Sequence, residues 1–502
     1  MSNAFLPQIE NIVFLMLENR SLDNLLGWLY AGNDPMHVYP AGSSTTYDGL
    51  NTGAYSNPYR TAFSGVQNYP VVRVPDNLGG DWDRVPGYDP YEEMKANSSW
   101  NGVLNQLFGN ENRIGGLPGS GTPAKMLGFL QDYYSWYMAT WKGLDILWTY
   151  PPSMLPVINT LARMYAVSDA WFCSVPTQTN PNRAFSLCGT SLGRENNATL
   201  TAVEQFPVPT VINSLVDAGR SWGLFFTDVW KNNLSYTEYT FPYLTKAGGA
   251  RGSIDDFIAL AKAGKLPSFS YLEPKWGYGK GTIFTQGTDY HPPTHIAPGE
   301  QFLAQIYGAL RTSPQWEKTL FIVTFDEHGG TYDHVAPRWG AINPDGKIGA
   351  DGFRFDLFGA RVPTLLISPY VANGTVFRAP SGSKYPFDHT SFIKTFLLWA
   401  GVDPNSAPLG KRVPAAPTFE GVLSPTVVNA LTFEAPLLAT ALDHPDVSQG
   451  AGGAGQPVNA LVEGIPFAAT RAILNSADSL PEVEAGVARY KADPEAFEAS
   501  LG

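Results

Sequence analysis

The chain has 502 residues, a formal net charge of -12, 44% hydrophobic residues and 16% charged residues. This length can bury a large core and, taken alone, would allow two or three domains. The acidic balance excludes a general nucleic-acid binder, which needs a basic surface for phosphate contacts. An acidic protein still binds phosphate when a cation inverts the local field.

Cysteine usage and the N-terminal residues limit the compartment. Cys173 and Cys188 are the only cysteines. They are too few for a disulfide-stapled scaffold or a thiolate zinc site, and we expect buried small side chains rather than a disulfide. Residues 1–17 lack the pattern of a signal peptide, and no run approaches the ~20 apolar residues that cross a bilayer. We expect a soluble protein without a transmembrane segment, either cytoplasmic or exported by a route without a recognisable N-terminal signal peptide.

Short apolar runs rich in branched and aromatic residues predict buried strands. Five are expected, at residues 12–17, 222–226, 269–272, 320–325 and 362–368. Helical periodicity is found at residues 154–165, after Pro298-Gly299-Glu300, and at residues 391–400. Strands that alternate with helices indicate an α/β sandwich around a mostly parallel sheet.

Two further segments have a distinct composition. Residues 31–123 are rich in Gly, Pro, Asn, Ser and Tyr with little periodicity. We expect a loop-rich insertion or cap there, because so many aromatic residues are unusual in a disordered segment. Residues 448–457 read SQGAGGAGQP, a flexible linker by composition, and lead to a charged helical pattern. The expected division is one main domain at 1–447, followed by a linker and helical tail at 448–502.

Acidic residues directly follow two of the predicted strands. Glu18-Asn19 follows the first strand, and Asp326-Glu327 follows the fourth. Ligand sites of α/β proteins lie at the carboxyl ends of strands. One carboxylate there is more often a helix cap, but two acidic strand ends in one sheet favour a cation, since adjacent carboxylates repel in a low dielectric. Oxygen ligands suit a hard or borderline divalent ion.

A third polar segment is SVPTQTNPNRAFSLCGTS at residues 174–191. Thr179 precedes a turn fixed by Pro181, and an apolar helical or strand segment follows. The hydroxyl could face outward at the edge of the sheet, although a plain turn is the simpler interpretation of this motif alone. Arg183 would supply a planar, permanently charged clamp for a phosphoryl group.

Six motifs in order carry a resemblance to a known family. They are ENRSLDNLLG, YPPSMLPVINTLA, DAWFCSVPTQTNPNR, DYHPP, TFDEHGGTYDHV and FDHTSFIKTFLLWAG, and they lie between about Ile9 and about Pro417. The chain resembles the phosphoesterase family that includes bacterial phosphatidylcholine phospholipases C and a group of acid phosphatases. This resemblance implies an α/β/α sandwich like that of alkaline phosphatase and the arylsulfatases, with a phosphoesterase catalytic domain over most of the chain.

The resemblance also implies roles for the polar residues. Glu18 and Asn19 correspond to one metal-binding pair, Asp326 and Glu327 to a second, and Thr179 to a nucleophile that also binds the metal. A threonine hydroxyl has too high a pKa to attack unaided, and metal coordination is one way to activate it. The implied cofactor is a divalent cation, with zinc expected first and calcium or manganese as alternatives. Attack by threonine would give a covalent phosphothreonine.

Three histidines match motif positions of that family. We expect His291, His334 and His389 to face the phosphate, either protonating the leaving alcohol or binding phosphoryl oxygens. By the same resemblance, His291 and His389 could instead hold a second ion together with Asp289. For His389 the alternative is structural, with a neighbouring residue such as Asp388 capping the helix that follows. The remaining histidines carry no clear assignment: His37, His295 and His444 are expected to be structural, and His328 is left open.

One position departs from the family pattern. Many members carry a histidine two residues after an Asp-Pro pair, whereas Asp89-Pro90 is followed by Glu92 at that place. Glu92 is grouped with Arg183 as a substrate-binding candidate. It could be a proton donor, an extra metal ligand or a solvent-facing residue, so the leaving-group chemistry of histidine-bearing members does not transfer in detail.

The leading expectation for function is a phospholipase C that releases diacylglycerol and phosphocholine. The SVPTQTNPNR and YPPSMLPVINTLA segments are similar to those of lipase members, and aromatic residues near Trp276 could enclose a quaternary ammonium. The alternative is an acid phosphatase acting on small monoesters. A sulfatase is disfavoured by the same resemblance. Arylsulfatases of this superfamily convert a cysteine or serine in a Cys/Ser-x-Pro-x-Arg sequence to a catalytic aldehyde, whereas Thr179 stands at that position here. A non-catalytic lipid- or metal-binding protein is disfavoured because Thr179 and both acidic pairs are retained. The expected partners are a phospholipid or small phosphate ester and, peripherally, a membrane; no obligate protein partner is evident.

Overall fold

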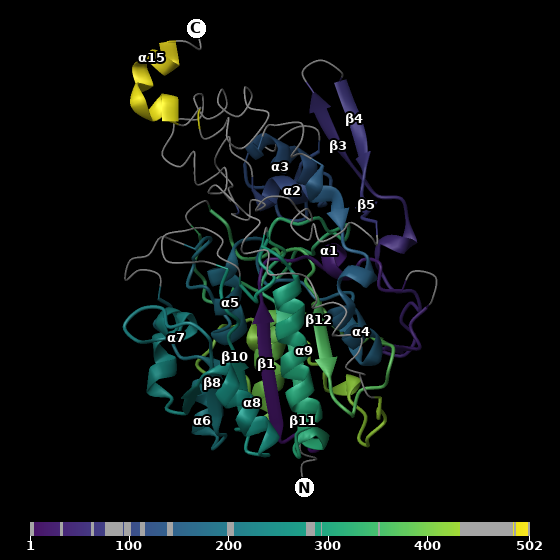
Figure 1. The fold of residues 1–502 in the computed structure, drawn as a ribbon, viewed down its shortest axis with the longest axis vertical. Coiled ribbons are helices and arrows are strands. Elements are labelled where there is room, and N and C mark those ends of the chain that lie inside the picture. The colour runs from purple at the N-terminus through teal and green to yellow at the C-terminus, as the bar shows by residue number, and fades with distance from the viewer. Residues whose placement is uncertain are drawn as a thin grey trace.

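The computed structural model describes residues 5–30, 34–61, 65–75, 94, 102–110, 116–137, 144–197, 205–277, 287–292, 294–349, 352–431, 485 and 488–499. Its centre is a nine-stranded sheet in the order β2-β13-β7-β12-β11-β1-β10-β8-β9 (Figure 1). The strands are β1 (Asn11–Leu17), β2 (His37–Tyr39), β7 (Ala166–Ser168), β8 (Trp222–Phe225), β9 (Ala250–Gly252), β10 (Phe269–Leu272), β11 (Thr319–Phe325), β12 (Thr364–Ile367) and β13 (Thr375–Phe377).

The sheet is mostly parallel, as the sequence predicts. Every recorded pairing in it is parallel except those that β12 makes with β11 and with β7. The five predicted strands are all present. Four three-residue strands, β2, β7, β9 and β13, were not predicted, because three residues are too few to show a period.

Helices cover both faces of the sheet. On one face α9 (Ala297–Arg311) packs against α4 (Pro156–Met164) and α8 (Ile254–Lys262), and in the view of Figure 1 α9 runs alongside β1. Elsewhere α10 (His389–Trp399) packs against α5 (Thr179–Leu187) and α6 (Val211–Asp217). The expected α/β/α sandwich is confirmed. Of the described helices, none is long and apolar enough to cross a membrane.

The central strands are apolar because they are covered on both sides. All seven residues of β1 are buried. Phe14 in this strand meets Phe392 and Phe396 of α10 with ring centroids 5.0 and 5.7 Å apart. Cys173 and Cys188 are buried free thiols, which confirms the sequence prediction for them.

The described part of residues 31–123 contains regular structure. It includes a hairpin of β3 (Ser56–Thr61) and β4 (Gly65–Pro70), β5 (Val72–Arg73), which pairs with β6 (Trp148–Thr149), and α2 (Val103–Phe108), which packs on α3 (Phe129–Tyr137). β2, from the same segment, joins the edge of the main sheet through β13. A second apolar cluster, separate from the main core, lies beneath this cap.

The structure also contains other short elements. They are α1 (Leu22–Leu26), α7 (Tyr236–Thr240), α15 (Pro494–Ala499) and the 3-10 turns η1 (Leu50–Thr52), η3 (Asp145–Leu147), η4 (Pro152–Met154), η6 (Pro242–Lys246), η7 (Trp316–Lys318), η8 (Val413–Ala415) and η9 (Glu420–Val422). The predicted linker at 448–457 lies outside the described residues, whereas α15 falls within the predicted tail. The domain boundaries themselves stay a prediction.

Candidate active site

The two acidic strand ends lie side by side. β1 and β11 are parallel neighbours, and their register pairs Leu17 with Phe325. Glu18 and Asp326 therefore leave the sheet at the same level, and the backbone NH of Asp326 donates to Leu17 O at 3.1 Å. Both carboxylates are buried. The sheet itself brings together residues that are more than 300 positions apart.

Asn19 and Gly329 hold the two strand ends close together. Asn19 has φ +56° and its NH donates to Asp326 Oδ1 at 3.0 Å. Gly329 has φ +63°, and a Cβ built there would lie 2.1 Å from Asn19 O. Only glycine permits this approach, which explains the first glycine of the Asp-Glu-His-Gly-Gly sequence.

Thr179 lies at the same acidic cluster. It is the first residue of α5, 7% exposed, and its Oγ1 is 3.3 Å from Glu18 Oε2 and 3.4 Å from Asn19 Oδ1. The segment after Thr179 is thus a helix, so the plain turn considered for this motif is not what forms. Pro181 fits in the first turn because the backbone NH it lacks would have no partner within the helix.

Arg183 follows one turn later on α5 and binds the acidic residues. Its Nη2 and Nε are 2.6 and 3.0 Å from Glu18 Oε1, and Nε is 3.4 Å from Asp326 Oδ2. The guanidinium also donates to the carbonyls of Met16 and Leu17 and stacks at 4.7 Å on Trp276. These contacts make Arg183 a support for Glu18 and Asp326, and direct binding of a phosphoryl group by Arg183 stays a prediction.

The cluster carries excess negative charge. Glu18 and Asp326 are buried against the guanidinium of Arg183, and the buried Glu327 follows Asp326 in the chain; these three carboxylates and one guanidinium leave a formal surplus of two negative charges. Burial and the neighbouring Asp326 raise the pKa of Glu18 well above its usual value, against the opposing effect of Arg183. Asp326 Oδ2 is buried and, apart from its 3.4 Å ion-pair contact with Arg183 Nε, accepts no hydrogen bond from any described residue. Oxygen ligands with this charge fit a divalent cation.

His291 orients the amide of Asn19. Its Nδ1 is 2.5 Å from Pro292 O, and its Nε2 is 3.0 Å from Asn19 Nδ2. Since Pro292 O can only accept, Nδ1 carries the proton and Nε2 accepts from the amide. Burial lowers the pKa of His291 to about 4, in agreement with a neutral ring. The Asn19 oxygen is thereby directed at Thr179.

Asp289 fixes the segment next to His291. It accepts hydrogen bonds from the NH groups of Gly277 at 2.6 Å and His291 at 3.3 Å, and burial raises its pKa to about 6. Its described contacts are therefore with the backbone. A role for Asp289 as a second-ion ligand stays a prediction.

The ring nitrogens of His389 contact protein atoms. Nε2 is 2.5 Å from Asp326 O, and Nδ1 is 3.5 Å from Trp171 Nε1. Asp388 is the N-cap of α10, and its NH donates to Ser391 Oγ, so the capping alternative forms in the structure. His389 thus holds the Asp326 backbone through its carbonyl, and a contact of His389 with a phosphate stays a prediction.

Glu327 and His328 link the cluster to the cap. Glu327 Oε2 accepts from Gly329 N at 2.6 Å and lies 3.5 Å from His328 Nδ1. His328 Nε2 is 2.8 Å from Gln106 Oε1 in α2, and burial lowers the pKa of His328 to about 3. The structure thereby gives His328, which the sequence left open, a neutral connecting position between Glu327 and α2.

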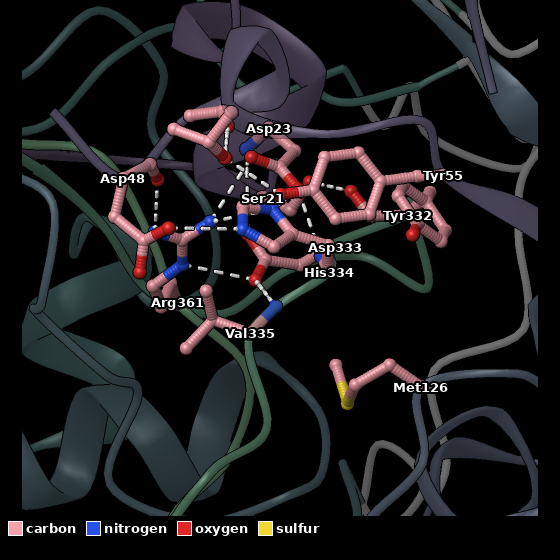
Figure 2. A network of polar contacts seen from close by, with 12 residues as sticks. Ser21, Asp23, Asp48, Tyr55, Met126, Tyr332, Asp333, His334, Val335 and Arg361 are labelled. Carbon is pink, nitrogen blue, oxygen red and sulfur yellow. Dashed lines mark hydrogen bonds and ion pairs between the residues drawn. The ribbon is translucent and has the colours of Figure 1, made fainter.

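His334 belongs to a second polar network, shown in Figure 2. Its Nδ1 is 2.6 Å from Asp23 Oδ2 and its Nε2 is 3.1 Å from Asp48 Oδ1. Arg361 bridges Asp23 at 3.0 Å and Asp333 at 2.9 Å. No contact joins His334 to Thr179 among the described residues. The expectation that His334 faces the phosphate stays a prediction.

This second network, which we call the Arg361 network, was missed by sequence reasoning. Asp23, Asp333 and His334 offer ligand atoms within 4.8 Å of one another, a spacing that a metal ion would accept. Arg361 forms ion pairs with both aspartates there, and hydrogen bonds to Asp23 and Asp48 favour a protonated His334 as a second positive charge, so the acidic cluster at Thr179 fits a cation better. Asp23 and Asp333 lie within two of the six family motifs. Arg361 lies just before β12, and nothing in the sequence around it indicates that it pairs with an acidic residue.

The Arg361 network predicts a pH-dependent stability. Burial opposes the protonation of His334, but hydrogen bonds to Asp23 and Asp48 outweigh it and raise the pKa of His334 to about 9. The stabilisation is fully present below the unfolded pKa of about 6.5 and is lost as pH rises through about 9. His334→Gln should therefore cost about 3 kcal/mol at pH 6 and much less near pH 10.

Denaturant unfolding at several pH values measures this difference, and His37→Gln is the control because His37 is exposed on β2. A cost of His334→Gln that is the same at pH 6 and pH 10 would show that the Arg361 network is not held by a charged histidine.

Of the predicted site residues, Glu92 lies outside the described residues, as does Tyr278, one of the aromatic residues near Trp276 considered for the ammonium; His444, expected to be structural, also lies outside them. The structure therefore places five predicted residues at one cluster, namely Glu18, Asn19, Thr179, Arg183 and Asp326, with His291 beside it. His389 and Glu327 border it, and His334 lies in the Arg361 network.

A parallel sheet that gathers a hydroxyl and several carboxylates at its strand ends defines an α/β enzyme. The chain belongs to the Phosphoesterase family, whose sequence profile matches residues 9–398, and it is a phosphoric ester hydrolase. The likeness to that family anticipated from the six motifs is thereby confirmed.

Curated relatives extend over most of the chain. Non-specific phospholipase C1 of Arabidopsis thaliana is 35% identical over 419 residues, which are 82% of this chain and 70% of that protein. Phospholipase C A of Mycobacterium tuberculosis strain H37Rv is 27% identical over 430 residues, which are 79% of this chain and 74% of that protein. Among solved structures, the phosphonate monoester hydrolase of Agrobacterium radiobacter is 12% identical over 55% of this chain and 74% of that chain, with a TM-score of 0.31, a likeness too low to bear on the site.

Proposed function

We propose that this phosphoric ester hydrolase is a cation-dependent phospholipase C that cleaves phosphatidylcholine-type lipids into diacylglycerol and phosphocholine. One observation carries the proposal: the Thr179 hydroxyl lies 3.3 and 3.4 Å from two oxygen ligands at the buried acidic strand ends. Relatives named phospholipase C, at 27% to 35% identity, support the diester substrate.

The proposed reaction has two displacements at phosphorus. The Thr179 hydroxyl gives up its proton and its Oγ1 forms a bond to phosphorus, while the bond to the diacylglycerol oxygen breaks and that oxygen takes up a proton. Water then attacks the phosphothreonine, which releases phosphocholine and restores the Thr179 hydroxyl. A divalent cation, with zinc proposed first, would lower the pKa of the hydroxyl and offset phosphoryl charge.

The chain's own residues hold this nucleophile in place. Glu18, Asn19, Asp326 and Glu327 are proposed to bind the cation together with Thr179. Arg183 holds Glu18 by two hydrogen bonds, and α5 presents Thr179 at its N-terminus, where the helix dipole favours negative charge. His291 keeps the Asn19 oxygen on the side of the nucleophile.

Aromatic side chains beside Thr179 support a choline head group. The hydroxyl of Tyr236 donates to Asn180 Oδ1 at 2.6 Å, directly after the nucleophile. Its ring lies 5.3 Å from Trp230 and 5.0 Å from Trp276, and Trp230 and Tyr236 are both half-buried. Such rings attract a quaternary ammonium through their π faces.

Substrate comparison tests this proposal. We expect faster turnover of a phosphatidylcholine diester than of p-nitrophenyl phosphate by the purified protein. Trp230→Ala should raise KM for the choline lipid about 3- to 30-fold, with a much smaller effect on the monoester, because only the lipid carries the ammonium.

The same assay includes a phosphatidic acid monoester as a lipid without a head group. A large excess of monoester cleavage over diester cleavage would replace the phospholipase proposal by an acid phosphatase. Equal effects of Trp230→Ala on all substrates would remove Trp230 from head-group recognition.

A further inference from the structure

Glu300 is a buried carboxylate on α9 that has no assigned role in the reaction. It is 1% exposed, and its two oxygens accept hydrogen bonds from the NH groups of Val157 at 2.6 Å and Ile158 at 3.1 Å. These are the first free NH groups of α4, since Pro156 before them has none. Glu300 therefore caps α4 from a different helix, which gives the YPPSMLPVINTLA motif a structural reason.

The same carboxylate binds Tyr290, and this contact points toward the active site. The Tyr290 hydroxyl donates to Glu300 Oε1 at 2.7 Å. Tyr290 has φ +71°, a conformation that is unfavourable for a bulky residue and persists only when its surroundings hold it. Its ring packs at 5.6 Å against Phe325, the residue before Asp326, and it fills the space that a side chain at Gly299 would need.

Tyr290 also contacts the segment that directly follows β1. Its carbonyl accepts from Arg20 Nε at 2.7 Å, and Arg20 comes directly after Asn19. On either side of Tyr290 lie Asp289 and His291, which fix the loop and the Asn19 amide as described above. One strained residue thus contacts the segments that carry Asn19, His291 and Asp326.

We propose that Tyr290, held by Glu300, is a positioning residue that sets the Asn19 amide and the Asp326 strand end for cation binding and nucleophilic attack. This inference rests on the proposed function of the Thr179 site. Its physical basis is that Glu300 links the N-terminus of α4 to the strained loop, so losing the link lets the His291–Asn19 pair shift. Replacing residues that hydrogen-bond to metal ligands commonly lowers metal affinity or activity 10- to 100-fold.

Tyr290→Phe tests the link with the smallest change, because the ring stays packed and Glu300 still caps α4. The matched control is Tyr307→Phe, which removes another buried tyrosine hydroxyl, bonded at 2.9 Å to Tyr165; Tyr307 lies on α9, the helix that carries Glu300, but outside the site. We expect about tenfold weaker zinc binding to the metal-free protein by calorimetry and about tenfold lower kcat for Tyr290→Phe. For Tyr307→Phe we expect both quantities to stay within about twofold of wild type, with a similar fall in Tm.

A double-mutant cycle with Glu300→Gln tests whether Tyr290 acts through Glu300. If it does, the fold-loss in zinc affinity of the double variant should be clearly smaller than the product of the single losses. Tyr290→Phe behaving like Tyr307→Phe would overturn the proposal, and multiplicative losses would remove Glu300 from it. A wild-type protein that binds zinc but cleaves no phosphate ester would instead reject the proposed function, while the zinc titrations would still test the Tyr290 link.

Discussion

Replacing Thr179 by alanine is expected to lower kcat for phosphodiester cleavage by about 10³-fold or more while leaving the fold intact. The reason is that no other described hydroxyl is recorded in contact with both Glu18 and Asn19, so the variant has no nucleophile at the cation ligands. Removing the nucleophile of a covalent hydrolase costs several orders of magnitude. The measurement is turnover of a choline diester together with Tm.

Two variants make the result specific to the hydroxyl at this position. Thr179→Ser keeps the hydroxyl and should retain measurable activity, with a phosphoserine detectable by mass spectrometry after acid quench. Thr177→Ala removes a buried threonine hydroxyl two residues away, which donates to the carbonyl of Glu195, and should keep kcat within about tenfold. Activity of Thr179→Ala close to that of wild type would eliminate Thr179 as the nucleophile.

Removing the cation should have an effect of comparable size. We expect exhaustive chelation to abolish hydrolysis, and zinc, or else calcium or manganese, to restore it. Without a cation, the negative charge of Glu18 and Asp326 disfavours loss of the proton from the Thr179 hydroxyl, so the nucleophile is not activated. Saturating wild type with cation at about 100 Kd should add about 2.7 kcal/mol to its stability. Asp326→Asn should lose both the restored activity and this stabilisation.

Asp333→Asn distinguishes the two places where a cation fits. Asp333 is an equally buried aspartate, but it lies in the Arg361 network. We expect this variant to keep one tightly bound cation per chain by metal analysis, although its Tm should fall because Arg361 loses a charged partner. Cation binding that survives Asp326→Asn and disappears in Asp333→Asn would move the cation to the Arg361 network and contradict the proposed active site.

Several parts of the site were readable in the sequence because each depends on local pattern. An apolar run that stops at Glu18 or Asp326 marks the carboxyl end of a buried strand, and the parallel register of β1 and β11 does bring these two ends together. The proline after Thr179 fits the start of a helix. The five longer strands of the main sheet and its burial on both faces followed from the same apolar runs, whereas the hairpin strands β3 and β4 were not predicted.

The orientation of side chains was decided by the tertiary structure. The sequence predicts that Arg183, His334 and His389 face a phosphate, and this stays a prediction; only the structure shows that they contact Glu18, Asp23 and the Asp326 carbonyl, respectively. A buried polar side chain takes whichever partners the fold places beside it, because an unpaired polar group or charge is costly to bury. Motif position alone cannot report which partner that is.

The sequence by itself determined the family, the sandwich of helices around a mostly parallel sheet, and the acidic residues that meet at two strand ends. Only the tertiary structure decided the antiparallel direction of β12 in the main sheet, the Arg361 network and the Glu300–Tyr290 link. These depend on contacts between residues such as Asp23 and Arg361, which are 338 positions apart, or between two helices and a loop. No local periodicity encodes such contacts, because they are set by how complete layers pack.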